Sequence, residues 1–433
     1  MPGSGSRPGD GDGPRALVIG GGIGGLTAAV ALHREGWQVT VLERAPAIEA
    51  VGAGLGLTPN SLRALDVIGL GDTVRSMRAW QAEGGLRTPS GRWLCRTSQD
   101  AAAARFGGPF VLLHRATLVS MLRSRLPEGA LVTGADAAIA DPGGADRPAV
   151  VRHGELEHEA ELVVAADGVH SAARSALFPG APAPRYAGFT AWRLVVPAPD
   201  VAYAPHETWG RGVLWGTQPL HDGRVYAYAA AAAPEGERAP DDEHAELRRR
   251  FGAWHDPVPA ILDAAGPDDV LRNDVFEAAV PLPALHRGRV AVLGDAAHAM
   301  PPTLGQGGNQ AVEDAIVLAH HAAPGADVPE ALAAYTRDRL PRTSEVVRRA
   351  VRVGRLVTLT SAPVCALRDA AMAAMNRLAP HLALRALDGI ADWSPPGHDG
   401  SVAARSAGTG TDGDGTEGAR TDGTGAEGGP GSG

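Results

Sequence analysis

The sequence predicts a mixed α/β fold with three parts: a Rossmann-like nucleotide-binding domain, an antiparallel sheet inserted into it, and long C-terminal helices. A short apolar run at 16–20 ends in a glycine-rich turn, and a helical pattern and a second apolar run follow it. Two later apolar runs, at 162–166 and 289–293, each end beside an aspartate and a glycine. Between them lies an alternating segment rich in aromatic residues, which is typical of antiparallel strands.

The order of these patterns predicts a discontinuous first domain. After residue 308 the pattern is helical nearly to 393, with expected interruptions near Pro324, Pro341 and Pro363. The ends are rich in Gly, Asp, Ser and Thr and have few large apolar residues, so we expect them to be disordered. The expected parts are a disordered lead at 1–14, the discontinuous nucleotide-binding domain at 15–184 and 285–330, the antiparallel-sheet domain at 185–284, C-terminal helices at 331–393, and a disordered tail at 394–433.

Composition excludes several classes of function. A formal net charge of −9 argues against nucleic-acid binding, which needs clustered Lys and Arg. No apolar run reaches the ~18 residues that span a bilayer, and the first residues lack the apolar stretch of a signal peptide. Two cysteines, Cys95 and Cys365, give neither a disulfide framework nor a metal site. We therefore expect a cytoplasmic protein with no metal, membrane or nucleic-acid partner.

The glycine-rich turn carries the most specific motif. G-x-G-x-x-G is satisfied at Gly20, Gly22 and Gly25, after a strand and at the start of a helix, which is the context of a dinucleotide site. The first glycine permits the tight turn, the second lets the backbone approach a pyrophosphate, and the third allows helix and strand to pack closely. Glu43 ends the second strand, where a carboxylate can bind an adenosine ribose. This motif alone does not distinguish FAD from NAD.

Aspartates follow both later strands of the same expected sheet. Asp167-Gly168 comes after LVVAA and Gly294-Asp295 after RVAVL, at the edge where ligands of α/β sheets bind. Carboxylates there can bind ribityl or ribose hydroxyls. After Asp295, a Pro-Pro break and a glycine-rich loop lead into another helix, whose N-terminal N–H groups would stabilise the negative charge of a reduced flavin. We expect His298 and Met300 in this loop to have packing roles.

In this order and spacing, GGGIGG with its later ER, ADGVHSAAR and GDAAHAMPPTLGQGGNQAVEDA resemble the FAD-dependent aromatic hydroxylases, the group A flavoprotein monooxygenases. The similarity is greatest to the salicylate hydroxylase-like and zeaxanthin epoxidase-like branch, over about residues 15–393. It implies that Arg115 contacts the phosphate or ribose region of FAD, that Asp167 serves both FAD and the nicotinamide cofactor, and that Asp295 holds the ribityl chain. The residues expected at the cofactor are Gly20, Gly22, Ile23, Gly24, Gly25, Glu43, Arg44, Gly54, Arg115, Asp167, Gly168, Gly294, Asp295, Gly305, Gly307, Gly308 and Asn309.

The resemblance implies an FAD-dependent monooxygenase that uses NADH or NADPH and O₂. It would hydroxylate or epoxidise an aromatic or other electron-rich small molecule through a flavin C4a-hydroperoxide. No second glycine-rich βαβ unit is present, as expected where the nicotinamide binds transiently. Two alternatives stay open: a reductase of the geranylgeranyl reductase type, which consumes no O₂, and a non-catalytic flavin-binding protein. A flavin-dependent halogenase is disfavoured because the W-x-W-x-I-P element and its lysine are missing. We expect a monomer or homodimer.

The substrate is expected at the aromatic sheet. Arg193 is the candidate catalytic residue, because a guanidinium can stabilise a developing anion or orient a phenolate. Urate-type members of the resembled branch tend to carry an arginine near 213–215, and none occurs there, so a urate-like substrate is disfavoured. The residues expected at the substrate are Trp192, Trp215, Gln218, Tyr226, Tyr228 and Pro302, with His221 as a weaker candidate.

Overall fold

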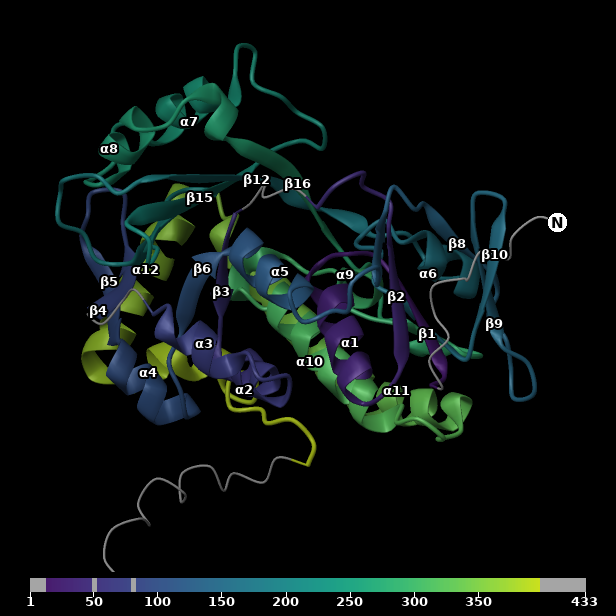
Figure 1. Ribbon diagram of the computed structural model, residues 1–433. Coiled ribbons are helices and arrows are strands. Elements are labelled where there is room, and N and C mark those ends of the chain that lie inside the picture. The colour runs from purple at the N-terminus through teal and green to yellow at the C-terminus, as the bar shows by residue number, and fades with distance from the viewer. Residues whose placement is uncertain (1–12, 49–52, 79–82, 398–433) are drawn as a thin grey trace, which may run out of the picture. The chain divides into compact units, whose positions relative to one another are not determined.

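Figure 1 shows the computed structural model, which describes residues 13–48, 53–78 and 83–397. The predicted β-turn-α-β unit is present as β1 (Arg15–Ile19), α1 (Ile23–Arg34) and β2 (Gln38–Glu43). It belongs to a six-stranded sheet in which all neighbours are parallel except β17 and β18. The sheet order is β17 (His286–Arg287), β18 (Val290–Val292), β11 (Leu162–Ala165), β1, β2, β7 (Leu131–Thr133). Because β1, β11 and β18 are adjacent and parallel, the glycine turn and both aspartates follow the same edge.

A seven-stranded sheet forms the second layer. Its central strands are antiparallel, as the alternating pattern predicts. It also takes in β4 (Glu83–Arg87) and β5 (Trp93–Ser98), which precede residue 185 in the chain, through a parallel pairing of β4 with β13 (His206–Trp209). The domain boundaries inferred from sequence stay a prediction. The order is β16 (Leu271–Glu277), β12 (Arg185–Pro197), β15 (Arg224–Ala232), β14 (Val213–Pro219), β13 (His206–Trp209), β4 (Glu83–Arg87), β5 (Trp93–Ser98).

The two faces of this sheet have different coverings. One face packs against α7 (Glu243–Phe251) and α8 (Val258–Asp263), which lie above it in Figure 1. Trp192 and Trp215 are buried in that cluster. The other face carries Phe189, Tyr228 and their neighbours, which pack against side chains of the two long C-terminal helices. Alternate residues of each strand therefore belong to two separate environments.

The remaining elements surround these two sheets. A three-stranded sheet and a strand pair complete the β-structure, in the order β8 (Ala137–Asp141), β9 (Ala149–His153), β10 (Leu156–Ala160), and β3 (Gly54–Leu57) with β6 (Val111–His114). The other α-helices are α2 (Pro59–Val67), α3 (Gly71–Ser76), α4 (Gln99–Phe106), α5 (Arg115–Arg123), α6 (Ala172–Leu177), α9 (Asp295–His298), α10 (Gly307–His321), α11 (Val328–Val357) and α12 (Ala362–Leu378). Three 3₁₀ turns are η1 (Pro267–Asp269), η2 (Pro302–Leu304) and η3 (Pro380–Leu387).

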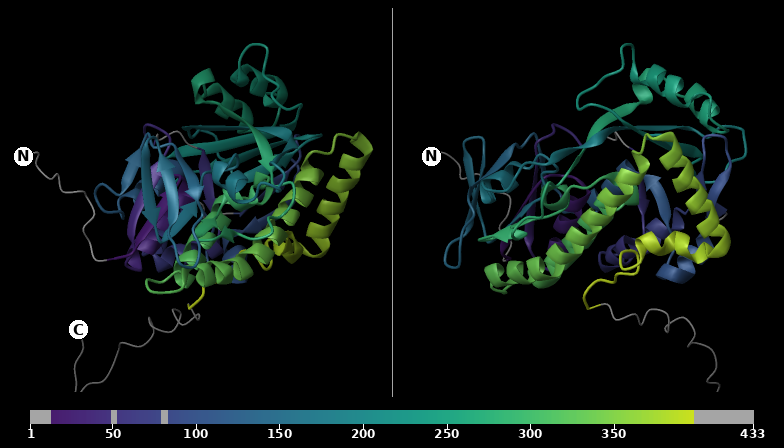
Figure 2. Two further views of the ribbon diagram at one scale, coloured as in Figure 1. Left: turned by 90° about the vertical axis from the view of Figure 1, so that its right-hand side faces the viewer. Right: turned by 180° about the vertical axis from the view of Figure 1, so that it is seen from behind.

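Helix α11 is longer than the sequence suggests. The chain does break near Pro324 and Pro363, but α11 continues through Pro341, where an interruption was expected. That expectation was wrong because contacts of the neighbouring Arg339 and Arg342 hold the helix on both sides of the proline. Figure 2 shows α11 and α12 as two long helices, and they meet at a bend of 119°.

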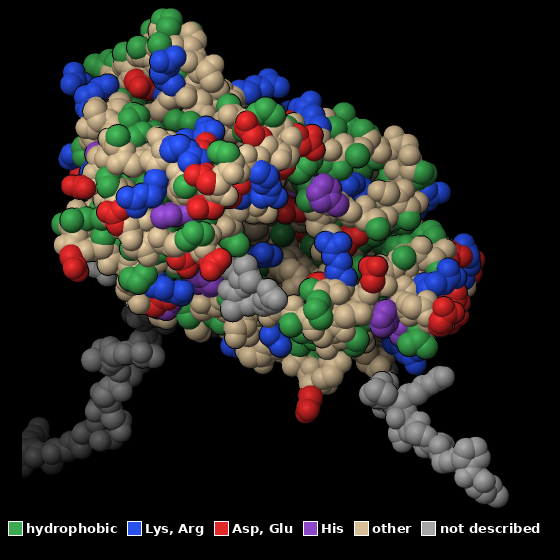
Figure 3. Space-filling model, turned by 90° about the horizontal axis from the view of Figure 1, so that it is seen from above, with side chains coloured by type: hydrophobic (Ala, Val, Ile, Leu, Met, Phe, Trp, Pro, Cys, Tyr) green, Lys and Arg blue, Asp and Glu red, His purple; other side chains and the backbone are tan. Residues whose placement is uncertain are grey.

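The surface has mixed charge. Acidic and basic side chains are interspersed on the face shown in Figure 3. Within the described ranges, no single helix is long and apolar enough to cross a membrane; α11 and α12 pass that test only when joined across their bend.

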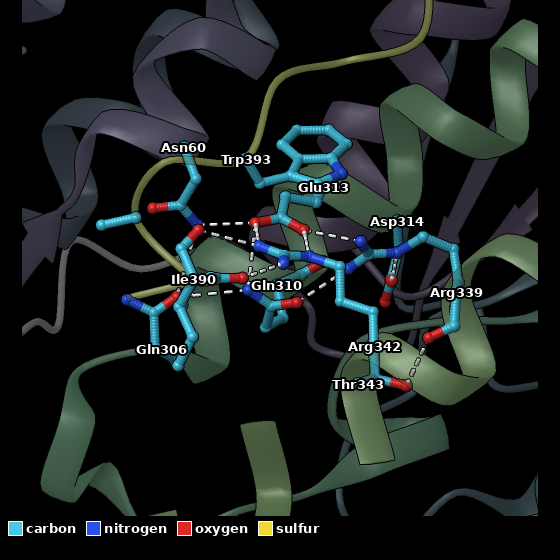
Figure 4. Close-up of polar contacts among 12 residues, drawn as sticks. Asn60, Gln306, Gln310, Glu313, Asp314, Arg339, Arg342, Thr343, Ile390 and Trp393 are labelled. Carbon is cyan, nitrogen blue, oxygen red and sulfur yellow. Dashed lines mark hydrogen bonds and ion pairs between the residues drawn. The ribbon is translucent and has the colours of Figure 1, made fainter. Parts of the chain in front are cut away.

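A buried ion cluster connects α10 to α11 (Figure 4). Glu313 and Asp314 on α10 are fully buried, and Arg339 on α11 reaches both, with Nη1–Oε2 at 2.6 Å and Nε–Oδ1 at 2.7 Å. Arg342 also binds Glu313, at 2.7 Å, and Asn60 on α2 donates to the same carboxylate at 2.6 Å. Burial alone would raise the pKa of Asp314, but His298 and Arg339 hold it below its usual range. Both carboxylates are therefore charged and paired inside the protein.

The same cluster fixes the last described segment of the chain. Arg342 donates to the carbonyl of Ile390 at 2.9 Å. The ring of Trp393 lies against both guanidinium groups, 5.7 Å from that of Arg339 and 5.5 Å from that of Arg342. Residues 388–393 are thus held to α10 and α11 by charged groups, not by apolar packing alone.

Replacing Arg339 by Met should lower the free energy of unfolding by about 3–5 kcal/mol, because it leaves two buried carboxylates short of a cation. Arg337→Met is the matched control: its ion pair with Glu330 is 3.4 Å long and both side chains are mostly exposed, so about 0–1 kcal/mol is expected. Urea unfolding of both variants measures the difference. Equal free energies of unfolding for the two variants would show that the buried cluster contributes no more to stability than a surface ion pair.

Candidate functional site

A side chain at each of the three motif glycines would meet different surroundings. Gly20 has φ +106°, and a Cβ there would lie 2.4 Å from the carbonyl oxygen of Ala166. A Cβ on Gly25 would lie 2.0 Å from the carbonyl oxygen of Gly20. On Gly22 it would meet only Nη2 of Arg115, at 3.9 Å. The protein itself therefore requires two of these glycines, whereas the third leaves open space at the N-terminus of α1.

The neighbours of the motif glycines are mainly structural. Ile23 is buried, and a Cβ on Gly24 would lie 2.8 Å from Cδ1 of Leu293, so this side of α1 packs on other elements. Only their backbone N–H groups are available to a ligand.

The carboxylate of Glu43, which was expected to bind a ribose, already has hydrogen-bond partners within the protein. Its Oε2 accepts a hydrogen bond from the Gly21 N–H at 2.6 Å, and its Oε1 accepts one from Ala45 at 2.8 Å. Glu43 therefore stabilises the turn between β1 and α1, and a ribose would have to share its oxygens. Arg44 is exposed.

Arg115 lies beside the glycine turn. It is the first residue of α5, and its backbone N–H donates to Ala53 at 3.0 Å. Its guanidinium is exposed, faces Gly22, and has no hydrogen bond or ion pair to any other residue that the structure describes. A free cation next to helix N–H groups is suited to an anion such as a pyrophosphate.

The two aspartates differ in what their oxygens do. Asp167 accepts from Ser171 Oγ at 2.6 Å and from the Ala173 N–H at 3.1 Å, so it holds the first turn of α6, which Ser171 caps; Gly168 follows with φ +82°. Each oxygen can accept a further hydrogen bond, so the expected role of Asp167 at FAD and the nicotinamide cofactor stays a prediction. Asp295, in contrast, is exposed and has no side-chain partner in the described part of the chain; its Oδ1 lies 3.7 Å from a Cβ placed on Gly307.

Hydrogen bonds of a buried side chain fix the loop before α10. Asn309 is buried and donates to the carbonyls of Gly56 and Gly305, at 2.9 and 2.6 Å, while accepting from Thr58. Its side chain thus binds the protein, and the expected place of Asn309 at the cofactor stays a prediction. Gly308 packs against Leu55. Gly294 donates to Asp314 Oδ2 at 3.0 Å, so the buried cluster also holds the start of α9.

These groups fit FAD. The open space at Gly22, the free Arg115 and the α1 N-terminus suit its pyrophosphate, and the free Asp295 beside the α10 N-terminus suits hydroxyls and a reduced, anionic ring. Around this edge, as elsewhere in the described residues, no group of three or more His, Cys, Asp or Glu could hold a metal ion.

Gly54 joins this edge to the seven-stranded sheet. A Cβ on Gly54 would lie 2.2 Å from the ring of Tyr226, so the ring packs directly on the backbone of β3. Its role is therefore close packing. The face of the sheet that carries Tyr226 is thus the face that adjoins the expected cofactor elements.

The candidate catalytic residue Arg193 shares that face with three expected substrate residues, Gln218, Tyr226 and Tyr228. In the strand register Arg193 lies opposite Tyr228, and Gln218 opposite Tyr226. Trp192 and Trp215 project to the other face, under α7 and α8, where both are buried. The prediction that they contact the substrate is corrected for this reason. Pro302 is exposed in η2, and His298 and Met300 are buried, as their expected packing roles require.

Glu207 was not found from sequence. Tyr228 donates to Glu207 Oε1 at 2.6 Å and Trp209 donates to Oε2 at 2.9 Å. Burial, together with the charge of Glu207, raises the pKa of Tyr228 well above its ordinary value. Burial also raises the pKa of Tyr226, and Arg193 partly offsets this. Both hydroxyls therefore stay protonated, and Arg193, whose Nη1 donates to Asn273 at 2.9 Å, is the cation of this wall.

Gly22→Ala should leave the fold intact and weaken FAD binding by about tenfold or more, since its methyl group would occupy the space open to a pyrophosphate. Gly25→Ala is the matched control, because its clash is with the protein itself, and it should lower the stability of the FAD-free protein. FAD titration by fluorescence and thermal unfolding separate the two effects. Wild-type FAD affinity in Gly22→Ala would contradict the assignment.

Comparisons with known proteins agree with this geometry. Residues 15–350 match the family described as FAD binding domain. The chain is 37% identical to aurachin C monooxygenase/isomerase of Stigmatella aurantiaca, over 83% of this chain and 94% of the relative. It is 37% identical to 3-amino-4-hydroxybenzoate 2-monooxygenase of Streptomyces cremeus, over 83% and 92%. The solved structure of Klebsiella pneumoniae HpxO with FAD and uric acid is similar, with a TM-score of 0.78 and 27% identity, over 86% of this chain and 97% of that one.

These relatives support the monooxygenase and not the reductase or the non-catalytic alternative. The mixed α/β fold and the expected family are confirmed by the same comparisons. This chain belongs to the FAD-binding family of aromatic hydroxylases that includes the salicylate hydroxylase-like enzymes, and it is an FAD-dependent monooxygenase.

Proposed function

We propose that this enzyme hydroxylates a planar aromatic ring that carries a hydroxyl or amino group, bound at the wall formed by Arg193, Gln218, Tyr226 and Tyr228. The observation that carries this proposal is the pairing of Tyr228 with Glu207 on the face that adjoins Gly54. The wall offers flat rings for stacking and a few fixed polar groups, which is the usual composition of a small-molecule site.

The polar groups indicate which substituents the substrate carries. Arg193 can donate to a phenolate or carboxylate oxygen, because its bond to Asn273 uses only one of its N–H groups. A phenol is electron-rich in its anionic form, which favours attack on an electrophilic oxygen, so a cation near its oxygen would orient and stabilise it. No second arginine occurs at 213–215, which disfavours a urate-like anionic substrate.

FAD would be held by the α1 N-terminus, Arg115 and Asp295, and bound FAD supplies the redox chemistry with NAD(P)H and O₂. The protein residues bind and orient the ring and exclude water from it. Arg193 fixes the substrate oxygen. Burial keeps Tyr226 and Tyr228 protonated, and because Tyr228 already donates its hydrogen to Glu207, its hydroxyl can only accept from the substrate. We also propose a cytoplasmic enzyme, monomeric or homodimeric and without nucleic-acid or membrane partners. Two free thiols fit that compartment.

A substrate screen tests the reaction. The purified, FAD-loaded protein is mixed with phenols, aminohydroxybenzoates, indoles and polyketide aromatics. NAD(P)H oxidation, O₂ uptake and product mass are recorded. We expect one of these classes to stimulate NAD(P)H oxidation with consumption of O₂ and a product heavier by one oxygen atom. Flavin reduction without O₂ uptake would instead identify a reductase, and no reduction at all would identify a non-catalytic protein.

Arg193→Ala should reduce product formed per NAD(P)H by about tenfold or more, as expected for the loss of one charge-assisted hydrogen bond, while FAD stays bound. Trp215→Phe is the matched control, because it changes a buried ring of the same sheet on the opposite face. It should lower stability without changing this ratio. An unchanged ratio in Arg193→Ala, or an equal fall in Trp215→Phe, would remove Arg193 from the site.

A further inference from the structure

The outer face of α12 is apolar and exposed. This helix lies at an outer edge of the molecule in both views of Figure 2, and its inner face packs on the seven-stranded sheet through Met372 and Ala373. On the opposite side of α12, all of which the structure describes, a stripe about 100° wide faces solvent and carries only apolar side chains. The residues of this outer stripe are Val364, Leu367, Ala371, Ala374, Met375 and Leu378. A helix that is apolar on both faces is normally buried on both, so the outer stripe lacks a partner.

The exposed area of the outer stripe is large for a monomer. Leu378 is 86% exposed, Leu367 70%, and Val364 and Met375 44% each. At about 100 Å² for each such side chain when fully exposed, these four present roughly 250 Å² of apolar surface, to which two alanines add. Contiguous apolar patches of more than a few hundred Å² are rare on soluble monomers and mark interaction surfaces. Because a standard stable interface buries about 800 Å² on each partner, the complex formed here is expected to be weak.

The spacing of the outer stripe fits a second copy of the same helix. Its positions 364, 367, 371, 374 and 378 follow one another in alternating steps of three and four residues, the repeat of helices that pair side by side. If two copies pair in antiparallel orientation about a two-fold axis at Ala371, this alanine meets its own equivalent. Leu367 then faces Met375 of the second copy, and Val364 faces Leu378. Small side chains at the centre let the helices approach, and large ones pack against each other on both sides, so the stripe is complementary to itself.

Charge and composition disfavour other partners and orientations. Helices that lie on membranes carry Lys and Arg along a polar face, but α12 has no lysine and its Arg368 is buried in an ion pair with Asp369. Within α12 this leaves Arg377 as the one exposed cation. A parallel pair would place the two copies of Arg377 side by side, whereas an antiparallel pair separates them. The chain's own tail, 398–433, has Val402 as its single large aliphatic residue and therefore offers little to cover the stripe.

We propose that two copies of this chain form a weak, reversible homodimer through an antiparallel pairing of their α12 helices. Burial of the outer stripe provides the driving force, and Ala371 lies at the two-fold axis. The inference concerns only this surface and does not depend on which ring the enzyme hydroxylates.

Sedimentation equilibrium of the FAD-loaded protein tests the dimer. Between about 1 and 100 μM the average mass should rise from one chain toward two, as expected for a dissociation constant in the micromolar range. Leu367→Glu should raise this constant by about tenfold or more, because each copy would bury a charge in the interface. Leu156→Glu is the matched control: Leu156 is 60% exposed on β10, outside α12, and its variant should dimerise as the wild type does. FAD absorbance and thermal unfolding establish that both variants are folded.

Disulfide cross-linking tests the orientation. Under mild oxidation Ala371→Cys should form a covalent dimer, since a residue on the two-fold axis meets its own equivalent within disulfide distance. Ala366→Cys, exposed on α12 outside the stripe, is the control and should stay monomeric on a non-reducing gel. A wild type that remains monomeric at all concentrations, equal effects of Leu367→Glu and Leu156→Glu, or cross-linking of Ala366→Cys in place of Ala371→Cys overturns the proposal. Monomers that sediment with phosphatidylserine vesicles through the stripe would also overturn it, in favour of a membrane. No turnover is measured, so these results are independent of the substrate screen.

Discussion

The pairing of two buried carboxylates with two arginines is the interaction on which the rest of the structure depends. Glu313 and Asp314 are adjacent on α10 and fully buried, so an unpaired charge at either would be strongly destabilising. Arg339 and Arg342 satisfy them from α11. This requirement fixes how α11 lies against α10 and keeps α11 helical through Pro341. It also holds the segment that ends at Trp393.

The same pair of carboxylates positions the cofactor edge. Asp314 accepts from Gly294 and from His298, which places the start of α9 and therefore Asp295. Glu313 accepts from Asn60 on α2, whose neighbours Thr58 and Ser61 bind Asn309. These buried hydrogen bonds thus hold in place two groups that are free at the surface, the Asp295 carboxylate and the N-terminus of α10.

Local signals in the sequence predict the cofactor side of the molecule well. A glycine turn acts within a few residues, and parallel strands carry Gly20, Asp167 and Asp295 to one edge whatever the rest of the chain does. Sequence does not show which oxygens are already bonded, as at Glu43 and Asp167, because three-dimensional folding decides which N–H and hydroxyl groups reach them. The bonds of the Asn309 side chain are equally hidden in the sequence, because its partners Gly56 and Thr58 lie far from it along the chain.

The substrate side depends on strand register, which a single sequence does not specify. Tyr226 and Tyr228 share a face by spacing alone, but whether Trp215 joins them depends on how β14 pairs with β15. The observed register places Trp215 beside Ala229, on the other face, and Gly216 beneath Tyr228. The missing side chain at Gly216 lets Tyr228 reach across β14 to Glu207. A glycine with no obvious role in the sequence therefore determines the polarity of the wall, because it puts a carboxylate within reach of the tyrosine that the substrate would meet.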